Sequence, residues 1–245
     1  MTTSWPWAVA AAALLFVAVH LFVGRLHVLR SVPRSNWLSL AGGAAVAYVF
    51  LHLLPELAEH QRNVADPSPT PADARSVYLV ALLGLATFYG LERHARRAGR
   101  GVRNGGGEDP IGGAFGVHAA SFAAYNLLVG YLLVRRERPG LAELCLYAVA
   151  MGLHFLATDH GLREHYGGRY DRLARWWFAA AVIAGCVLGV VVELPATVIA
   201  MLFAFLAGGV LLNVMKEELP EERESAFLPF VAGVAAYAAL LWAAA

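Results

Sequence analysis

Apolar residues run through the chain in eight long stretches that are separated by short polar connections. A helix needs roughly 20 predominantly apolar residues to cross the hydrocarbon core of a bilayer, and each stretch comes close to that length. The pattern predicts an all-α integral membrane protein, residues 1–245, built as one domain of eight transmembrane helices. The spans are expected at about residues 5–27, 37–58, 76–94, 112–134, 141–163, 174–193, 195–215 and 226–244.

Composition and charge agree with a membrane protein and argue against a nucleic-acid partner. Hydrophobic residues make up 59% of the chain and charged residues 15%, whereas a soluble domain is roughly 45–50% apolar and about 25% charged. The formal net charge of +1 gives no case for the clustered basic face that binds nucleic acid. No basic segment precedes the first stretch, so that stretch is expected to be a retained span.

Arginines concentrate in alternate connections and thereby predict how the chain crosses the membrane. Positive charge marks the cytoplasmic side, and the first, third, fifth and seventh connections are the basic ones. Both termini are therefore expected outside, although Arg135, Arg136 and Arg138 oppose the rule. Lys216 is the only lysine, which indicates a GC-rich bacterial genome. The expected location is a bacterial inner membrane.

Two spans share a small-residue start and a proline-containing end. Ala41-Gly42-Gly43 leads to Leu54-Pro55-Glu56, and Ala207-Gly208-Gly209 leads to Leu219-Pro220-Glu221. Because the second and seventh spans cross in opposite directions, the similarity predicts an inverted repeat with three spans on each side of a central pair. Transporters of this kind bind substrate near the midplane at the repeat interface. Alternatively, Gly-Gly and Leu-Pro-Glu are simply common helix-packing and helix-end features.

Polar side chains at membrane depth are the main functional candidates, because each costs free energy unless a partner, water or a metal offsets it. On the fourth and fifth spans these are His118, Tyr125, Asn126, His154, Thr158, Asp159 and His160. We expect Asn126 to meet His154 near the midplane. One level lower, His118 is expected to meet Thr158 or Asp159. Imidazole and carboxylate groups suit zinc and similar divalent ions; the alternative is that these residues only bond one another across helices.

The second span carries a candidate entrance for a cation. His52 and Glu56 share a helix face by their spacing, and the acidic connection that follows would concentrate cations. The alternative is that the helix ends near Pro55 and leaves His52 at the interface. Structural roles are expected for His20, in helix packing, and for Arg163, as an ion-pair partner of Asp159.

These features resemble the ZIP (Zrt/Irt-like) family of metal-ion transporters over nearly the whole chain. The resemblance rests on eight spans with outside termini, the His52-Leu53-Leu54-Pro55-Glu56 end of the second span, the Leu91-Glu92 close of the third, and Ala207-Gly208-Gly209 in the seventh. It implies a three-two-three inverted-repeat fold. It also implies a metal centre between the fourth and fifth spans.

The centre of the chain departs from the family's metal-site signatures. The family pattern is kept at Asn126, Gly130 and His154. Positions that hold ligands in the family are occupied by Tyr125, Val129, Phe155 and Thr158, and two family prolines are replaced by Leu128 and Ala157. The expected replacement is a site about two turns further inward, built from His118 with Thr158, Asp159 or His160.

Three functions of different classes follow. The leading hypothesis is a ZIP-like transporter that moves a divalent transition metal, zinc foremost, toward the cytoplasm. Its partners are the lipid bilayer and the metal, and the small residues from Gly185 to Gly189 would allow a homodimer. The second hypothesis is a ZIP-fold protein that has lost transport and acts as a binding or partner subunit. The third is an intramembrane zinc hydrolase that uses Ser121 and Asp159 beside the histidines, although no enzymatic activity is the expectation.

Overall fold

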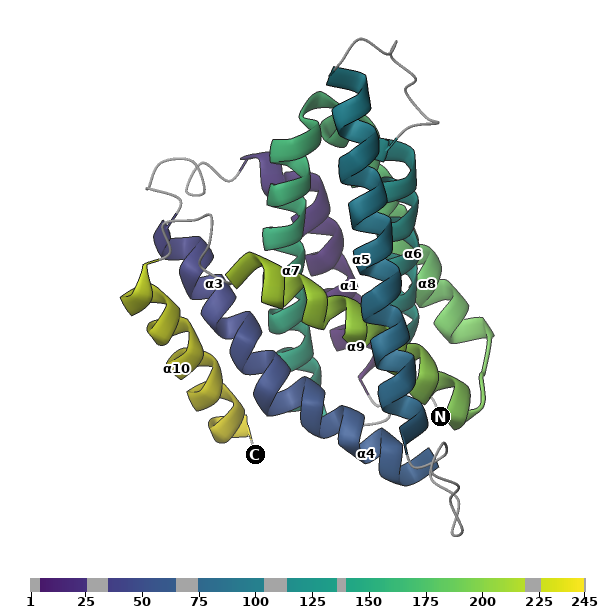
Figure 1. Cartoon of the computed structure of the whole chain (residues 1–245). Coiled ribbons are helices and arrows are strands. Elements are labelled where there is room, and N and C mark those ends of the chain that lie inside the picture. Colours follow the sequence, from purple (N-terminus) through teal and green to yellow (C-terminus); the bar gives the residue numbers. More distant parts are fainter. Residues whose placement is uncertain are drawn as a thin grey trace.

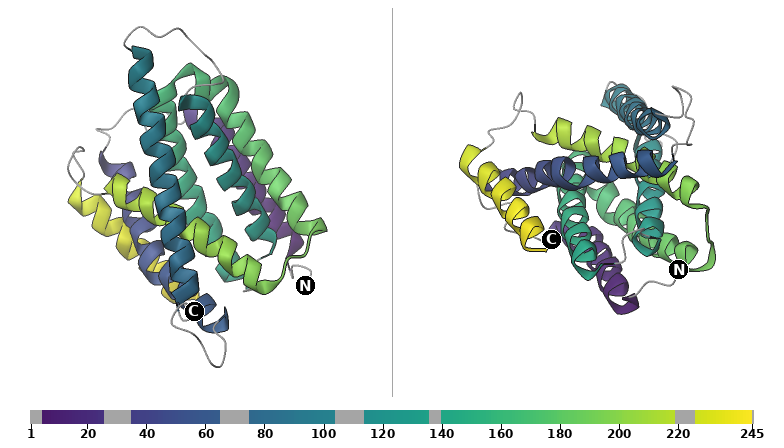
Figure 2. Two further views of the ribbon diagram at one scale, coloured as in Figure 1. Left: turned by 45° about the vertical axis from the view of Figure 1, so that its right-hand side comes forward. Right: turned by 90° about the horizontal axis from the view of Figure 1, so that it is seen from below.

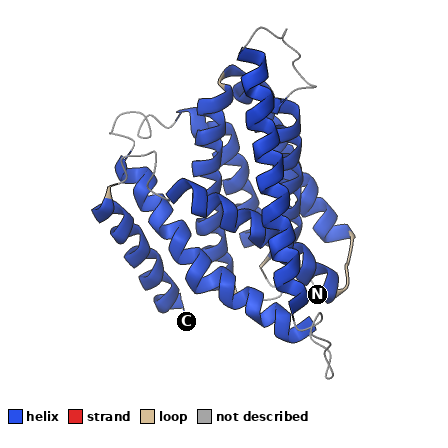
Figure 3. Ribbon diagram, in the orientation of Figure 1, coloured by secondary structure: helices blue, strands red, loops and turns tan. Residues whose placement is uncertain are grey.

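The computed structural model describes residues 5–25, 35–64, 75–103, 114–135, 140–218 and 226–244, which are helical apart from short turns (Figures 1 and 3). The elements are α1 (Pro6–Phe22), η1 (Val23–Arg25), α3 (Ser35–Tyr48), η2 (Val49–Leu53), α4 (Leu54–Val64), α5 (Ser76–Arg103), α6 (Ala114–Val134), α7 (Leu141–Tyr166), η4 (Tyr170–Ala174), α8 (Arg175–Val191), α9 (Ala196–Glu218) and α10 (Phe227–Ala244). The predicted all-α class is confirmed.

Five helical segments within the described ranges are long and apolar enough to cross a membrane: Pro6–Arg25, Ser39–Val64, Leu141–Arg163, Tyr170–Val191 and Ala196–Lys216. Shorter apolar helices cover His118–Val134 and Phe227–Ala243. The chain is therefore an all-α membrane protein. Helix α5 continues through the arginine-rich segment to Arg103, beyond the span end expected near residue 94. The connections at 26–34, 65–74 and 104–113 lie outside the described residues.

Two π-helical turns shape the segments that carry interior polar side chains. Pro55 has no backbone N–H to bond the carbonyl four residues back, and in the turn before it the Leu54 N–H bonds to the Val49 carbonyl. The helix then continues to Val64, so the alternative in which it ends near Pro55 is wrong. The second π turn, η4, follows the end of α7 and buries Tyr170. A π turn shifts the helix face by part of a turn.

Glycines permit the closest helix contacts, beginning with α3 and α10, which lie side by side in Figure 1. A Cβ atom built at Gly43 would lie 2.0 Å from the carbonyl oxygen of Phe230. A Cβ atom at Gly233 would lie 2.0 Å from the carbonyl oxygen of Leu40. The two backbones thus touch where each helix lacks a side chain, which is how small residues bring helices together in a membrane.

The pair formed by α5 and α9 repeats this arrangement. A Cβ atom at Gly208 would lie 1.9 Å from the Ala81 carbonyl oxygen, and one at Gly84 would lie 2.1 Å from that of Phe205. The spacing from Phe205 to Gly208 equals that from Leu40 to Gly43. By these contacts Gly208 is the counterpart of Gly43. An alignment of the two Ala-Gly-Gly stretches would instead pair Gly43 with Gly209, one position later.

Helix α7 runs through the middle of the bundle, with α1 and α3 packed against it (Figure 2). Helix α1 also packs against α8. Phe16 of α1 and Phe155 of α7 meet edge to face, with ring centroids 5.2 Å apart. This contact lies one turn from His20 along α1, and it sets α1 directly against the polar half of α7.

Candidate functional site

A buried imidazole joins three helices in the interior of the bundle. His20 Nδ1 lies 2.6 Å from Asp159 Oδ2 of α7, and His20 Nε2 lies 2.8 Å from Asn126 Oδ1 of α6. His20 is 0% exposed, and Asp159 and Asn126 are each 1% exposed. At such burial an ionised group is tolerated only when it is paired and hydrogen-bonded. We refer to His20, Asp159 and Asn126 as the central triad.

Neighbouring groups hold the central triad in place. The Asn126 side-chain N–H donates to the Phe122 carbonyl at 2.8 Å, which fixes the orientation of the amide. Tyr170 donates from its hydroxyl to the His20 carbonyl at 3.3 Å and also interacts with the Asp159 carboxyl. The rings of Phe155 and Phe178 pack on the His20 imidazole, with centroids 4.7 and 5.7 Å away.

Three buried polar atoms next to the triad have no hydrogen-bond partner within the described part of the chain: Tyr125 OH, His154 Nε2 and Thr158 Oγ1. His154 and Thr158 lie one turn apart on α7, and the Tyr125 ring of α6 lies 5.8 Å from the His154 ring. A buried polar atom without a partner costs free energy and requires an explanation such as water or a bound ion. We call these three residues the open group.

Buried tyrosines extend from the open group toward the end of the bundle where α7 begins, which we call the Glu143 end. Tyr48 of α3, Tyr147 of α7 and Tyr237 of α10 are all buried. The Tyr48 hydroxyl lies within electrostatic range of Glu56 and of the Tyr147, Tyr237 and Tyr125 hydroxyls. Helices far apart in sequence therefore contribute hydroxyl groups to the same buried region, which we call the tyrosine row.

An imidazole and two carboxylates close this row at the Glu143 end. His52 Nε2 lies 3.5 Å from Glu56 Oε2 and 3.9 Å from Glu143 Oε2. The His52 ring stacks on Tyr48 with centroids 5.4 Å apart. The predicted proximity of His52 and Glu56 is confirmed, while their role as an entrance stays a prediction. Two carboxylates around one imidazole attract a cation.

The opposite end, which we call the Arg163 end, carries a partly exposed ion pair. Arg163 donates from Nε and Nη2 to the two carboxylate oxygens of Asp171 at 2.9 and 3.1 Å. Tyr166, nearby on α7, lies 3.0 Å from His118 Nδ1. Burial, together with the Glu92 carboxylate, raises the pKa of the Tyr166 phenol, so the hydroxyl keeps its proton.

The central triad, the open group, the tyrosine row and the His52 cluster together form one array of side chains, which we call the polar column. From the Glu143 end toward the Arg163 end, its members are Glu143, Glu56, His52, Tyr48, Tyr237, Tyr147, Tyr125, His154, Thr158, Asn126, His20, Asp159 and Tyr170. They come from the helices α1, α3, α4, α6, α7 and α10 and from the two π turns, η2 and η4. Polar side chains buried inside a membrane protein are a functional hypothesis by default.

Several predicted pairings are wrong because the first span occupies the centre. Asn126 and Asp159 were expected to meet residues of the fourth and fifth spans or Arg163, and both bond to His20 instead. Arg163 pairs with Asp171. His118 bonds to Tyr166. His160, next to Asp159, is only half-buried.

Sequence reasoning missed His20, Tyr170 and Glu143 as members of the column. His20 carried the same signal as His154, an imidazole within an apolar span, yet helix packing was its expected role. Tyr170 lies in what reads as a loop, and only the π turn buries it. The contact of Glu143 with His52 depends on how α3 and α4 cross α7.

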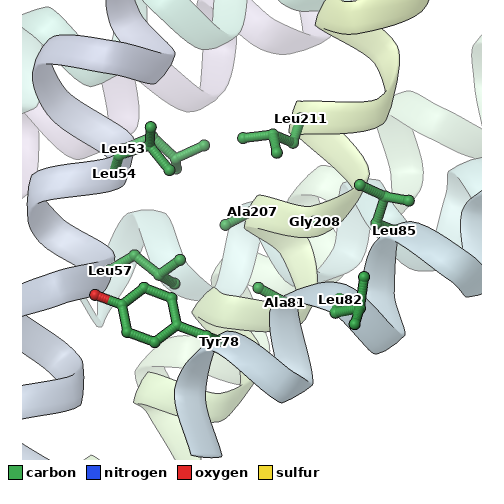
Figure 4. A pocket seen from close by; sticks show the side chains of 10 residues that line it. All are labelled: Leu53, Leu54, Leu57, Tyr78, Ala81, Leu82, Leu85, Ala207, Gly208 and Leu211. Atoms are coloured by element: carbon green, nitrogen blue, oxygen red, sulfur yellow. The ribbon is translucent and has the colours of Figure 1, made fainter. Parts of the chain in front are cut away.

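No group of three or more His, Cys, Asp or Glu side chains within the described ranges is arranged to hold a metal ion by itself. Hydroxyl or amide groups would have to complete any such site. An apolar pocket of about 210 Å³ between α4, α5 and α9 does not supply one (Figure 4). Its lining includes Leu57, Leu82 and Leu211, and Tyr78 brings its one polar side chain.

Neither a protein-family model nor a curated protein sequence matches the chain. The geometry of the polar column is therefore what carries the functional conclusion.

Proposed function

We propose that the protein is a membrane transporter of ZIP-like architecture that moves a divalent transition-metal ion, zinc foremost, toward the cytoplasm. The observation that carries the proposal is the open group. A ring nitrogen and two hydroxyl oxygens, buried and without a partner among the described residues, are suitable for a transient metal ligand set. Asp159, next to Thr158 in the chain, brings the negative charge that such a site needs in a low dielectric.

The inverted repeat is supported by the glycine contacts. Gly43 and Gly233 join α3 to α10 in the same manner as Gly208 and Gly84 join α9 to α5. In Figure 1, α3 runs from the upper part of the bundle downward, whereas α9 runs upward. Two helix pairs with matching contacts and opposite directions are what an inverted repeat produces. Spans six to eight then repeat spans one to three around α6 and α7.

The polar column supplies a path for the ion. The carboxylates of Glu56 and Glu143 flank His52 and would capture the cation at the Glu143 end. Placing the termini outside by the positive-inside rule makes this the outer end. The tyrosine hydroxyls would then pass the ion to the open group. Weak, mostly neutral ligands hold an ion loosely enough to release it, which transport requires.

Metal flux into vesicles that contain the purified protein tests the proposal. Zinc is added outside, and a metal-sensing dye inside reports entry. We expect saturable influx in the wild type and a loss of at least tenfold in His154→Ala. His60→Ala is the matched control, since His60 is 4% and His154 5% exposed and the His60 ring packs on Phe203 of α9. A folded wild type without flux would overturn transport and favour the hypothesis of a partner subunit.

A further inference from the structure

Three arginines at the Arg163 end make no ion pair with a carboxylate of the described residues. Arg169, Arg172 and Arg175 lie on and beside the π turn η4, at intervals of three residues. The one acidic residue of that turn, Asp171, gives both of its carboxylate oxygens to Arg163. This end of the bundle therefore carries positive charge that the described side chains do not balance.

Two further carboxylates near these arginines are bonded elsewhere. Asp159 is buried in the central triad and faces His20. Glu92, which lies within electrostatic range of Tyr166, pairs with Lys216 across α5 and α9. Neither carboxylate therefore neutralises the arginines around η4.

Arg175 shows more than an excess of charge. Its Nε atom is buried and has no hydrogen-bond partner within the described ranges, although the side chain as a whole is only half-buried. The guanidinium carbon lies 5.3 Å from the centre of the Trp176 ring. A buried N–H group of a cation without a partner requires an explanation. A ligand that brings anionic oxygens would satisfy it with short, strong hydrogen bonds.

Helix α8 presents an apolar surface directly after these arginines. It lies on the outside of the bundle (Figure 2), with Phe178 on its inner face against His20 and Phe122. Trp176 and Trp177 are exposed at its start, and tryptophan is enriched at the level of the lipid headgroups. Exposed apolar side chains then continue along the helix, at Ile183, Val187, Leu188, Val190 and Val191.

We propose that the start of α8 binds an anionic phospholipid from the leaflet at the Arg163 end. The headgroup phosphate would accept hydrogen bonds from the guanidinium groups of Arg172 and Arg175, whose planar arrangement of donors fits phosphate oxygens. The acyl chains would lie along the exposed apolar residues of α8. Basic residues at the ends of membrane-spanning helices recognise anionic headgroups in this way.

The apolar surface of α8 favours a lipid over a soluble phosphate. Both ligands offer the same phosphate oxygens to Arg172 and Arg175. Only the lipid also covers the exposed residues from Trp176 to Val191, because its headgroup and acyl chains follow the order of charge, aromatic ring and apolar side chains along α8. None of the arginines belongs to the polar column, so the lipid site can be tested apart from metal transport.

Lipid binding to the purified full-length protein tests the proposal. Native mass spectrometry counts bound molecules of dioctanoyl phosphatidylglycerol, the anionic probe, and of dioctanoyl phosphatidylcholine, the zwitterionic probe. We expect saturable binding of the anionic lipid, about tenfold tighter than that of the zwitterionic lipid. Arg175→Gln should abolish most of this preference. Arg62→Gln is the matched control, because it removes an exposed arginine from α4, which follows the His52 cluster, and it should leave the preference unchanged.

Two further comparisons complete the test. Arg172→Gln changes an exposed position of the same site and must also reduce the preference, so it serves if Arg175→Gln does not fold. Glycerophosphoglycerol, the headgroup without acyl chains, should bind about tenfold or more weakly than the lipid. Equal binding of this headgroup would overturn the lipid as the ligand and assign the site to a soluble phosphate. Equal affinity for the two lipids, or an equal loss in Arg62→Gln, would overturn the site itself.

Discussion

His20 Nδ1 and Asp159 Oδ2 lie 2.6 Å apart although the two residues are 139 positions apart in the chain. This contact ties α1 to α7 at a point that is inaccessible to solvent. Removing one partner of such a pair leaves the other buried and unpaired, which typically costs about 3–5 kcal/mol. Replacing both by apolar groups costs much less.

We therefore predict that His20→Leu lowers the free energy of unfolding by about 3–5 kcal/mol. The double variant His20→Leu/Asp159→Leu should recover most of this loss, because no buried carboxyl is then left without its imidazole partner. Thermal unfolding in detergent measures both, with His60→Leu as the control for losing a buried histidine. Equal losses in the single and double variants would show that His20 and Asp159 contribute independently.

The glycine contacts predict opposite effects for two substitutions on one helix. A Cβ atom at Gly84 would lie 2.1 Å from the Phe205 carbonyl oxygen, whereas a Cβ atom at Gly90 would meet no atom within 4 Å. Gly84→Ala should force α5 and α9 apart and cost about 1–3 kcal/mol. Gly90→Ala should stabilise α5 by about 0.5–1 kcal/mol, since alanine favours a helix. Unfolding of the two variants in the same detergent provides the comparison, and a neutral Gly84→Ala would contradict this packing.

Substitution of Glu143 is predicted to weaken metal capture near His52 without changing the interior of the bundle. Replacing Glu143 by Gln removes one of two carboxylates near His52. We expect the half-saturating zinc concentration for influx to rise about twofold to tenfold, equivalent to a loss of up to about 1.4 kcal/mol. The difference should shrink at high salt, because partly exposed charges are screened. An unchanged half-saturating concentration at low salt would exclude Glu143 from capture.

Metal affinity should distinguish the Asp159 carboxyl of the column from the Glu56 carboxyl. Asp159 is buried beside the open group, whereas Glu56 lies in the more accessible His52 cluster. Asp159→Asn is therefore expected to weaken zinc or cadmium binding to the purified protein by more than Glu56→Gln does. Titration calorimetry on the two variants makes the comparison. Equal effects would argue against an interior binding site.

The candidate site was predictable from sequence only in its residue types. Asn126, His154, Thr158 and Asp159 stood out because a polar side chain within an apolar stretch is visible without any tertiary information. All four are buried in the structure. The partners of Asn126 and Asp159 were not predictable, because a hydrogen bond between spans depends on which helices touch. Neither spacing within α6 nor spacing within α7 reveals that α1 lies against both.

The sequence by itself determined the all-α class and the approximate helix positions. Hydropathy over about 20 residues is a local property of the sequence, and it decides whether a helix can cross the bilayer. Tertiary structure decided the rest. The glycine contacts between α3 and α10 and between α5 and α9 fix which helices adjoin. The π turn before Pro55 and the turn at Tyr170 direct side chains that a regular helix would place elsewhere. His20 lies at the centre of the triad because α1 packs against α6 and α7. Such close packing, unlike hydropathy, depends on the shapes of surfaces that meet only after folding.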